Sequence, residues 1–149
     1  MELDETDVKI LQTLLTDARL SNRQIAKAVG VSVGTVIARI QKMEKEGIIK
    51  GYSTILDHEK LGYELTAITE ITVSKGKLLD VEKEIAKLPN VCAVYDVTGL
   101  TDAMVIVKSK SRQELSEFVK TVLTMPFVER TNTHVVLTTV KEDYRGFVG

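Results

Sequence analysis

Residues 21–45 read SNRQIAKAVGVSVGTVIARIQKMEK, a stretch with the pattern of two short helices joined by a tight turn. Ser21 followed three residues later by Gln24 is a capping box, which predicts that a helix begins here. Gly30 interrupts that helix, and Ser32 is suited to cap a second one. Two helices joined by a short glycine-containing turn predict a helix-turn-helix motif.

The helix predicted after Ser32 has an apolar stripe and a polar outer face, and Gly47 ends it. The positions of the apolar stripe are Val33, Val36, Ile37, Ile40 and Met43. The outer face carries Thr35, Ala38, Lys42 and Lys45, with Ser32 and Arg39 on one flank. Helices of this kind bury the apolar stripe and present the other face to solvent or to a partner.

A further helix is predicted upstream, where Asp4 can act as the N-cap. Its apolar residues recur at helical spacing: Val8, Leu11, Leu14 and Leu15. The small Ala26 allows the two following helices to pack closely, and Val36 fills the space between them. Residues 1–50 are therefore predicted to form a three-helix, winged-helix-like helix-turn-helix domain.

The charge distribution points to double-stranded DNA as the partner of this domain. The whole chain has a net charge of −1, but residues 19–50 carry seven basic and two acidic side chains, a net charge of +5. A basic stretch on a helix-turn-helix is the expected electrostatic footprint for DNA. A solvated helix face with no partner is the alternative reading of the charge alone.

Each residue of the outer face has an expected role in DNA binding. The N-terminus of the third helix, at Ser32, directs amide donors towards a phosphate. The residues expected to face the major groove are Thr35, Ala38, Arg39 and Lys42. Those expected to contact the phosphate backbone are Arg23, Lys27 and Lys45.

The rest of the chain alternates between strand and helix patterns. Residues 48–56 are strand-like, and residues 51–64 are assigned as a strand and linker between domains. The predicted order after them is strand 65–73, helix 76–88, strand 91–97, strand 103–107, helix 112–124 and strand 128–140. In the strand at 91–97, Val91, Ala93, Tyr95 and Val97 are expected on one face. Residues 141–149 form a C-terminal tail.

A weak internal repeat supports a duplicated β-α-β unit. With an offset of 37 residues, Leu78 aligns with Leu115 and Pro89 with Pro126. Two such units predict a ferredoxin-like βαββαβ domain over residues 65–140, and hence an α+β protein. Its helices would cover one face of the sheet, so we expect a homodimer to cover the other.

Several classes of protein are disfavoured by composition. One cysteine, Cys92, and two histidines leave no disulfide framework, and neither a metal site nor a cofactor is predicted. No apolar run is long enough to span a membrane. The N-terminus is acidic and polar, unlike a signal peptide, so a cytoplasmic protein without membrane contact is expected.

Taken together, these features closely resemble the Lrp/AsnC family, the feast/famine regulators of bacteria and archaea. The resemblance covers nearly the whole chain. The segments that carry it are LDETD (3–7), RQIAK (23–27), GVS (30–32), RIQKMEKEGIIKGY (39–52), LGY (61–63), VYDVTG (94–99) and PFVERTNT (126–133).

The resemblance implies a sequence-specific transcriptional regulator that is modulated by an amino acid or related metabolite. It also implies dimers that assemble further, into tetramers or octamers, with the effector bound between dimers. The positions that match the family's effector site are Thr98, Gly99, Leu100, Thr101, Asp102, Thr131 and Thr133. Where the family loop often has an aromatic residue before the aspartate, this chain has Thr101.

Two other functions compete with this reading. An architectural, chromatin-like DNA-binding protein without an effector would share the fold and the basic helices. Some Lrp-like proteins decarboxylate sirohaem, but that chemistry needs cationic and histidine groups, and this chain offers only His134 in the sensing domain. The protein is therefore expected not to be an enzyme.

Overall fold

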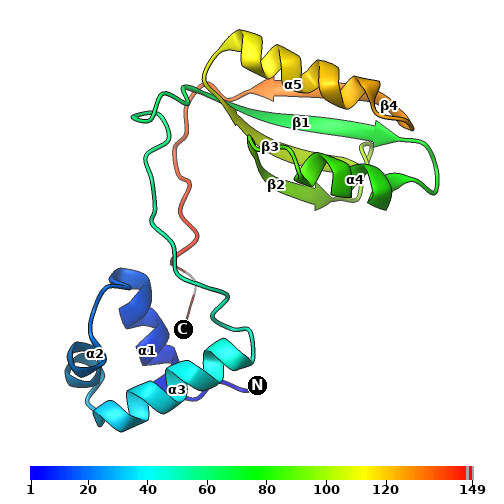
Figure 1. The fold of residues 1–149 in the computed structure, drawn as a ribbon. Helices are drawn as coiled ribbons and strands as arrows, with labels where there is room; N and C mark the ends of the chain where they lie inside the picture. Colours follow the sequence, from blue (N-terminus) through cyan, green and yellow to red (C-terminus); the bar gives the residue numbers. More distant parts are fainter. Residues whose placement is uncertain (147, 149) are drawn as a thin grey trace. The chain divides into compact units, whose positions relative to one another are not determined.

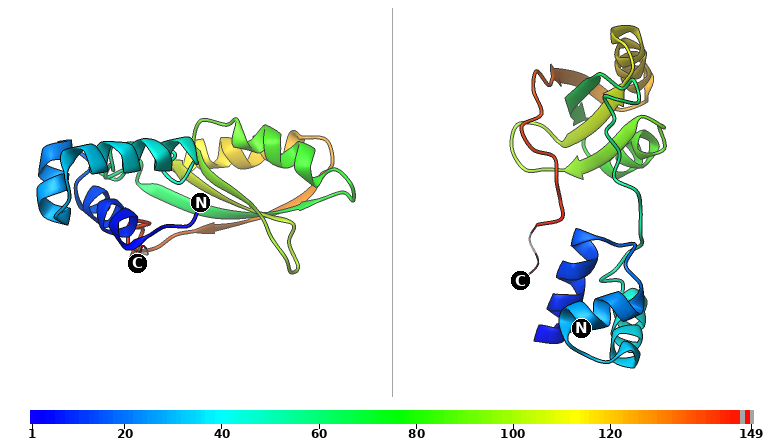
Figure 2. Two further views of the ribbon diagram at one scale, coloured as in Figure 1. Left: turned by 90° about the horizontal axis from the view of Figure 1, so that it is seen from below. Right: turned by 90° about the vertical axis from the view of Figure 1, so that its left-hand side faces the viewer.

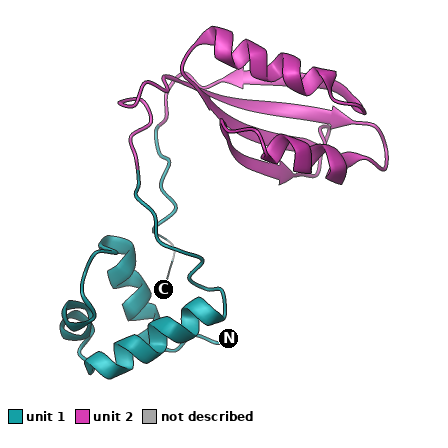
Figure 3. Ribbon diagram, viewed as in Figure 1, with its two compact units in different colours: residues 1–55, 140–149 teal, residues 56–139 magenta. Residues whose placement is uncertain are grey.

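The computed structural model describes residues 1–146 and residue 148, and it divides the chain into two compact units (Figure 3). The first unit comprises residues 1–55 and the described part of residues 140–149, and the second comprises residues 56–139. In the described residues, no helix has the length and apolar character needed to cross a bilayer. Each unit has a hydrophobic core of its own.

The first unit contains three helices, α1 (Glu5–Thr16), α2 (Asn22–Val29) and α3 (Val33–Lys45) (Figure 1). All three predicted N-caps are confirmed. The side chains of Asp4, Ser21 and Ser32 each accept a hydrogen bond from the backbone N–H three residues later. Gly30 ends α2 with a φ of +83°, a conformation that glycine adopts without strain.

The core of this unit buries only part of the predicted apolar stripe of α3. Val36 and Met43 are fully buried, together with residues of α1 and α2. Val33 and Ile37, predicted to be part of the buried stripe, are each 38% exposed. The reason is geometric, because α3 packs against only two short helices and these cover one side of it.

The strand-like run at residues 48–56 is not a strand in this structure. Ile48 and Ile49 close the turn after α3, each donating its backbone N–H to the carbonyl of Met43. The following residues form no described ladder, and Ile55 and Leu56 are exposed. Alternation of apolar residues favours extended backbone, but a strand also needs a neighbour with which to pair.

The second unit is an antiparallel sheet with two helices, in the order β1 (Leu65–Val73), α4 (Leu78–Ala86), β2 (Val91–Asp96), β3 (Ala103–Ser109), α5 (Arg112–Thr124) and β4 (Val128–Val135). The strands lie in the order β2-β3-β1-β4. This arrangement confirms the predicted ferredoxin-like βαββαβ topology and the α+β class.

Both helices lie on the same face of the sheet, as the views in Figure 2 show. Ile71, Val105 and Val107 of the sheet pack there against Val81 and Ile85 of α4 and against Phe118 and Val122 of α5. Within the second unit, no described helix covers the opposite face. It presents Ile68, Met104 and Ile106, together with the half-exposed ring of Tyr95.

A bulge in β2 changes which of its side chains face the core. Val91 pairs with Val107, but Ala93 pairs with Ile106, so the register shifts by one residue at Cys92. Consequently Val94, rather than Ala93 and Tyr95, packs with Val91 against the core. The prediction of Ala93 and Tyr95 on the face of Val91 was wrong, because regular alternation does not continue through a bulge. Val97 lies beyond the end of the strand. Cys92, which lies at this bulge, is exposed.

The last strand is shorter than predicted, because its partner ends. The alternating pattern ran to Val140, but β4 stops at Val135. Beyond it, the N–H of Val136 donates to the carbonyl of Thr66 at 2.8 Å, close to the start of β1. With no further β1 residues to pair, the remaining alternating residues leave the sheet.

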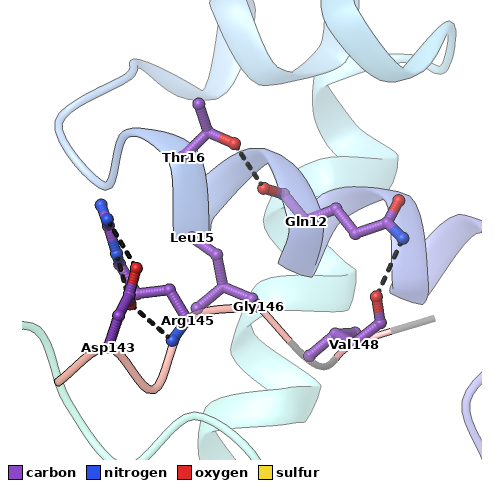
Figure 4. Close-up of a pocket in the computed structure, with 7 residues that line it drawn as sticks. All are labelled: Gln12, Leu15, Thr16, Asp143, Arg145, Gly146 and Val148. Atoms are coloured by element: carbon purple, nitrogen blue, oxygen red, sulfur yellow. Dashed lines mark hydrogen bonds and ion pairs between the residues drawn. The ribbon is translucent and has the colours of Figure 1, made fainter. Parts of the chain in front are cut away.

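The described part of the C-terminal tail packs on α1 within the first unit (Figure 4). Gln12 Nε2 donates to the carbonyl oxygen of Val148 at 3.0 Å, and the Val148 side chain joins the helical core. The Arg145 side chain makes two hydrogen bonds to the Asp143 carboxylate, at 2.9 and 3.0 Å. These side-chain contacts and a backbone N–H of Arg145 lower the pKa of Asp143 to about 2.

Candidate nucleic-acid interface and effector site

The outer faces of α2 and α3 present cations that are free to meet a polyanion. Arg23, Lys27, Lys42 and Lys45 are all exposed, and none of them forms an ion pair within the described residues. Ala38, an exposed residue of α3, adds no charge and no bulk. This surface therefore carries unpaired positive charge, which DNA binding requires.

The N-terminus of α3 is organised by its own cap. Ser32 Oγ accepts from the Thr35 N–H at 3.1 Å and lies 2.9 Å from Thr35 Oγ1. The two hydroxyls hold each other, so their first role is to begin the helix. The backbone N–H groups of the first turn have no partners inside a helix and point along its axis, where a phosphate oxygen can accept from them.

Arg39 differs from the other cations, because it is bound to acidic residues of α1. Its Nη1 donates to Asp7 Oδ1 at 3.2 Å and also to the Asp4 carboxylate. Asp7 is only 2% exposed, and these hydrogen bonds raise the pKa of Arg39, with Asp4 contributing most. Arg39 therefore ties α3 to the first turn of α1. The sequence did not reveal this role, since the partners are 35 and 32 residues away.

The loop between β2 and β3 holds five of the predicted effector residues. Gly99 has a φ of +113°, and Leu100 at the loop tip is 99% exposed. Thr101 Oγ1 donates to the Ile71 carbonyl at 3.1 Å, and the Asp102 carboxylate accepts from the Val73 N–H at 2.9 Å. Thr101 and Asp102 thus fasten the loop to the end of β1, whereas Thr98, Gly99 and Leu100 are exposed.

The other two predicted effector residues lie in a separate groove between β4 and α5. Thr131 pairs with Ile71 and Thr133 with Thr69, so both threonines are on the helix-covered side of the sheet. Thr133 Oγ1 lies 3.1 Å from Thr69 Oγ1. The groove has a volume of about 620 Å³, and its lining is Leu65, Arg112, Leu115, Ser116, Val119, Lys120, Thr131, Thr133 and Val135.

Within one chain, the two groups of effector residues lie on opposite sides of β1: Thr101 donates to the carbonyl of Ile71, and Thr131 pairs with the same residue from the other side. The central strand β1 lies between β3, which follows the loop, and β4, which carries the threonines. The groove also contains two residues that the sequence reasoning missed, Arg112 and Lys120. Their spacing along α5 with Leu115 and Val119 was the available signal, since positions i, i+3, i+7 and i+8 share one helix face.

The uncovered sheet face carries a polar cluster next to its apolar residues. His134 Nε2 lies 2.8 Å from the Glu70 carboxylate, and Asn132 Nδ2 donates to the same carboxylate at 2.7 Å. The contact with His134 is the main reason why the pKa of Glu70 is lowered, and Asn132 adds to it. The described residues contain no group of three or more histidine, cysteine or acidic side chains arranged to hold a metal ion.

Comparison with known protein families assigns both units. Residues 3–50 match the winged helix-turn-helix DNA-binding model, and residues 66–146 match the Lrp/AsnC ligand binding domain. The chain is 51% identical over 145 residues to an uncharacterised HTH-type transcriptional regulator of Pyrococcus furiosus, covering 97% of this chain and 98% of that protein. It is 38% identical over 140 residues to the HTH-type transcriptional regulator FL11 of Pyrococcus horikoshii, covering 94% and 93%.

Solved structures show the same fold. A transcriptional regulator from Neisseria meningitidis in complex with L-Met superposes with a TM-score of 0.89 at 28% identity, covering 97% of this chain and 96% of that one. Escherichia coli AsnC superposes with a TM-score of 0.89 at 26% identity, covering 95% and 97%.

A helix-turn-helix unit joined to an Lrp/AsnC ligand-binding unit defines a DNA-binding transcriptional regulator, and not an enzyme. The chain belongs to the Lrp/AsnC family.

Proposed function

We propose that this protein is a sequence-specific regulator whose DNA binding is modulated by an amino acid or a related small metabolite. The observation that carries the DNA-binding part is the unpaired basic surface of α2 and α3. An unpaired cation that neutralises a phosphate releases a counterion from the DNA and so adds to the binding free energy. A cation that already has an acidic partner adds little.

In this proposal the outer face of α3 enters the major groove. Thr35, Ala38 and Lys42 face base edges or the groove wall, and the N-terminus of α3 at Ser32 receives a phosphate. Arg23, Lys27 and Lys45 contact the backbone. Arg39 contributes mainly by holding α3 in place, because its Nη1 is shared by Asp4 and Asp7.

We further propose that the effector binds where the two groups of predicted residues meet between neighbouring dimers. The exposed loop residues Thr98, Gly99 and Leu100 come from one copy, together with Thr101 and Asp102. The groove containing Thr131 and Thr133 comes from another. This arrangement is supported by their separation within one chain, and by the complex of the related Neisseria meningitidis regulator with L-Met.

The uncovered sheet face supports a homodimer. Its apolar residues Ile68, Met104 and Ile106 form a continuous patch across β1 and β3, with Tyr95 beside them on β2. A second copy burying this patch would remove its apolar surface from water, which is the main favourable term in association. Further assembly into tetramers or octamers would then create the sites between dimers.

The experiment measures binding of the purified protein to DNA from upstream of its own gene and to a scrambled fragment of equal length. Lys42→Ala is compared with Lys83→Ala, which removes the same charge from an exposed position of α4 in the other unit. Selective binding at physiological salt, weakened by Lys42→Ala alone, supports the regulator. Equal loss in both variants contradicts the assigned DNA surface.

An architectural DNA-binding protein is the second candidate, favoured by the same basic surface. It predicts equal affinity for the two fragments, a steep salt dependence and no response to amino acids. The regulator predicts a preference for one fragment and a change in its affinity when the effector is added.

A further inference from the structure

The chain passes between the two units twice. It leaves the first unit after Ile55 and returns to it after Thr139, so the described residues of the C-terminal tail group with the helices (Figure 3). The match to the Lrp/AsnC ligand binding domain, in contrast, extends to residue 146. A segment that belongs to the ligand-binding domain by sequence therefore belongs to the DNA-binding unit by its contacts.

At its start, the tail is continuous with β4. The N–H of Val136, directly after this strand, donates to the carbonyl of Thr66 at 2.8 Å, and this bond fixes the start to the sheet. Beyond it, the side chains of Leu137 and Val140 are 97% and 93% exposed. A tethered group docks with an effective concentration that depends on the length and geometry of its tether. Docking of the tail therefore depends on the state of β4.

Near its end, the tail is attached to α1. Gln12 Nε2 donates to the carbonyl oxygen of Val148 at 3.0 Å, and the half-buried Val148 side chain joins the core of the first unit. The tail and the helix together line a hollow of about 420 Å³, which Leu15 and Arg145 border (Figure 4). An attachment at the rim of a hollow can open and close while the helices stay folded.

The tail has an ordered turn next to this attachment. Arg145 donates to the Asp143 carboxylate from Nε at 2.9 Å, from Nη2 at 3.0 Å and from its backbone N–H at 3.0 Å. A segment that is already ordered loses less conformational entropy on docking than an open chain. The turn therefore favours a tail that docks and is released as one piece.

Helix α1 connects the attachment of the tail to α3. Gln12 lies in the C-terminal half of this helix, whereas Asp7 lies in its first turn and Asp4 caps it. Both carboxylates bind Arg39 of α3. Since a helix moves as a stiff element, a shift of α1 at Gln12 reaches Arg39 and so the orientation of α3.

We propose that the tail is a strap that couples the ligand-binding unit to the DNA-binding unit, docked on α1 when DNA is bound. Docking favours DNA binding because Val148 then packs in the core that holds the three helices together. Coupling between two sites is reciprocal, so DNA bound to the first unit also affects β4. This inference rests on the proposed function in one respect, the contact of α3 with DNA.

The test is hydrogen exchange of the full-length protein, measured by mass spectrometry with and without saturating DNA from upstream of its own gene. DNA should slow exchange in the peptide covering β4 and Val136 by about fivefold or more, because a docked strap restrains the end of the strand. No DNA contact is proposed for β4. Protection of α3 in the same samples reports DNA binding itself.

The double variant Gln12→Met/Val148→Ser removes the donor and the apolar side chain of the attachment without adding charge. It should abolish the effect of DNA on β4 while α3 is still protected. Gln12→Met alone changes an exposed residue, leaves the core intact and should weaken the effect. The matched control is Gln113→Met, the same substitution at an exposed position of α5 that does not line the groove, and it should behave as the natural protein.

The outcomes separate the strap from the DNA-binding surface. Unchanged exchange in β4 while DNA protects α3 would overturn the strap and leave the surface in place. An effect that persists in the double variant would also contradict the strap and would assign the coupling to residues 56–64. Loss of the effect in Gln113→Met would show that the attachment is not its cause. No protection of α3 in the natural protein would refute the proposed DNA contact and this inference together.

Discussion

The two units differ in the sequence separation of the contacts that define their helices and strands. In the first unit, every helix begins at a side chain that bonds to a backbone N–H three residues later. In the second unit, β1 pairs with β3 and β4, and Ile71 is held between Ala103 and Thr131. Local signals therefore suffice for helix boundaries, whereas strand boundaries depend on partners that are distant in the sequence.

The largest expected effect tests whether the two cores are energetically separate. Met43→Ala in the first unit and Ile85→Ala in the second remove fully buried side chains, and each should cost about 2–5 kcal/mol of unfolding free energy. Because the buried residues fall into two clusters, each variant should destabilise only its own unit. Amide hydrogen exchange, followed residue by residue, measures this. Equal loss of protection in both units would show a single cooperative core.

A smaller effect is expected for the glycines with positive φ. Gly30→Ala forces a side chain into the left-handed region at a helix end, which costs about 1–2 kcal/mol. No atom lies within 4 Å of the added Cβ, so backbone strain accounts for the cost. Gly99→Ala, in the β2–β3 loop, introduces the same kind of strain at a φ of +113°. Urea unfolding measures both variants, and an unchanged midpoint for Gly30→Ala would contradict the expected strain at that turn.

Removing either of two helix caps in the helix-turn-helix should lower stability by a similar amount, but the two variants should differ in their affinity for DNA. Ser21→Ala and Ser32→Ala each remove a side chain that accepts from a helix N–H, at about 1 kcal/mol. Ser32 begins the helix proposed to enter the major groove, so Ser32→Ala should weaken DNA binding more than Ser21→Ala at a temperature where both variants are folded. Thermal unfolding and fluorescence anisotropy give the two quantities. Equal weakening would assign both effects to stability alone.

The smallest effect concerns acid sensitivity, because the groups involved are exposed and screened by solvent. The pKa of Glu70 is lowered by His134, so its ionised form stabilises the fold above the ordinary value near 4.5, and this stability is lost as the pH falls below it. The pKa of Asp143 is lowered to about 2, so its contribution persists to lower pH. Glu70→Gln should reduce the change in the unfolding free energy of the second unit with pH between about pH 5 and 3. Asp143→Asn should change the pH dependence of the unfolding free energy of the first unit, and it should do so at lower pH.

The unfolding free energies of Glu70→Gln and Asp143→Asn are measured by urea unfolding at a series of pH values. Hydrogen exchange assigns each change to one of the two units. A Glu70→Gln variant that keeps the pH dependence of the natural protein would show that the contact with His134 does not stabilise the folded state. An Asp143→Asn variant that alters only the second unit would contradict the packing of the tail on α1.

Much of the fold followed from the sequence, and the reasons are local. The caps at Asp4, Ser21 and Ser32, and the spacing of apolar residues along α5, predicted helix positions that the structure confirms. The strand at residues 65–73 was also predicted with its correct limits. The repeat of β-α-β units indicated the sheet topology, because two such units have few ways to bury their helices against one sheet.

The DNA-binding surface was predictable to a similar degree. Arg23, Lys27, Lys42 and Lys45 are exposed as expected, because charged residues opposite an apolar helical stripe remain in water. Their contact with DNA remains a proposal. The exceptional behaviour of Arg39 was not predictable, since Asp4 and Asp7 reach it only when α1 packs against α3.

What the sequence alone determined is the identity and order of the five described helices and of the four described strands of the sheet, because capping and hydrophobic periodicity act over a few residues. Only the tertiary structure decided the bulge at Cys92, the end of β4 at Val135 and the separation of Thr131 from the β2–β3 loop. It alone also revealed the burial of Glu82. Each of these depends on pairing or packing between residues far apart along the chain, which no local pattern records.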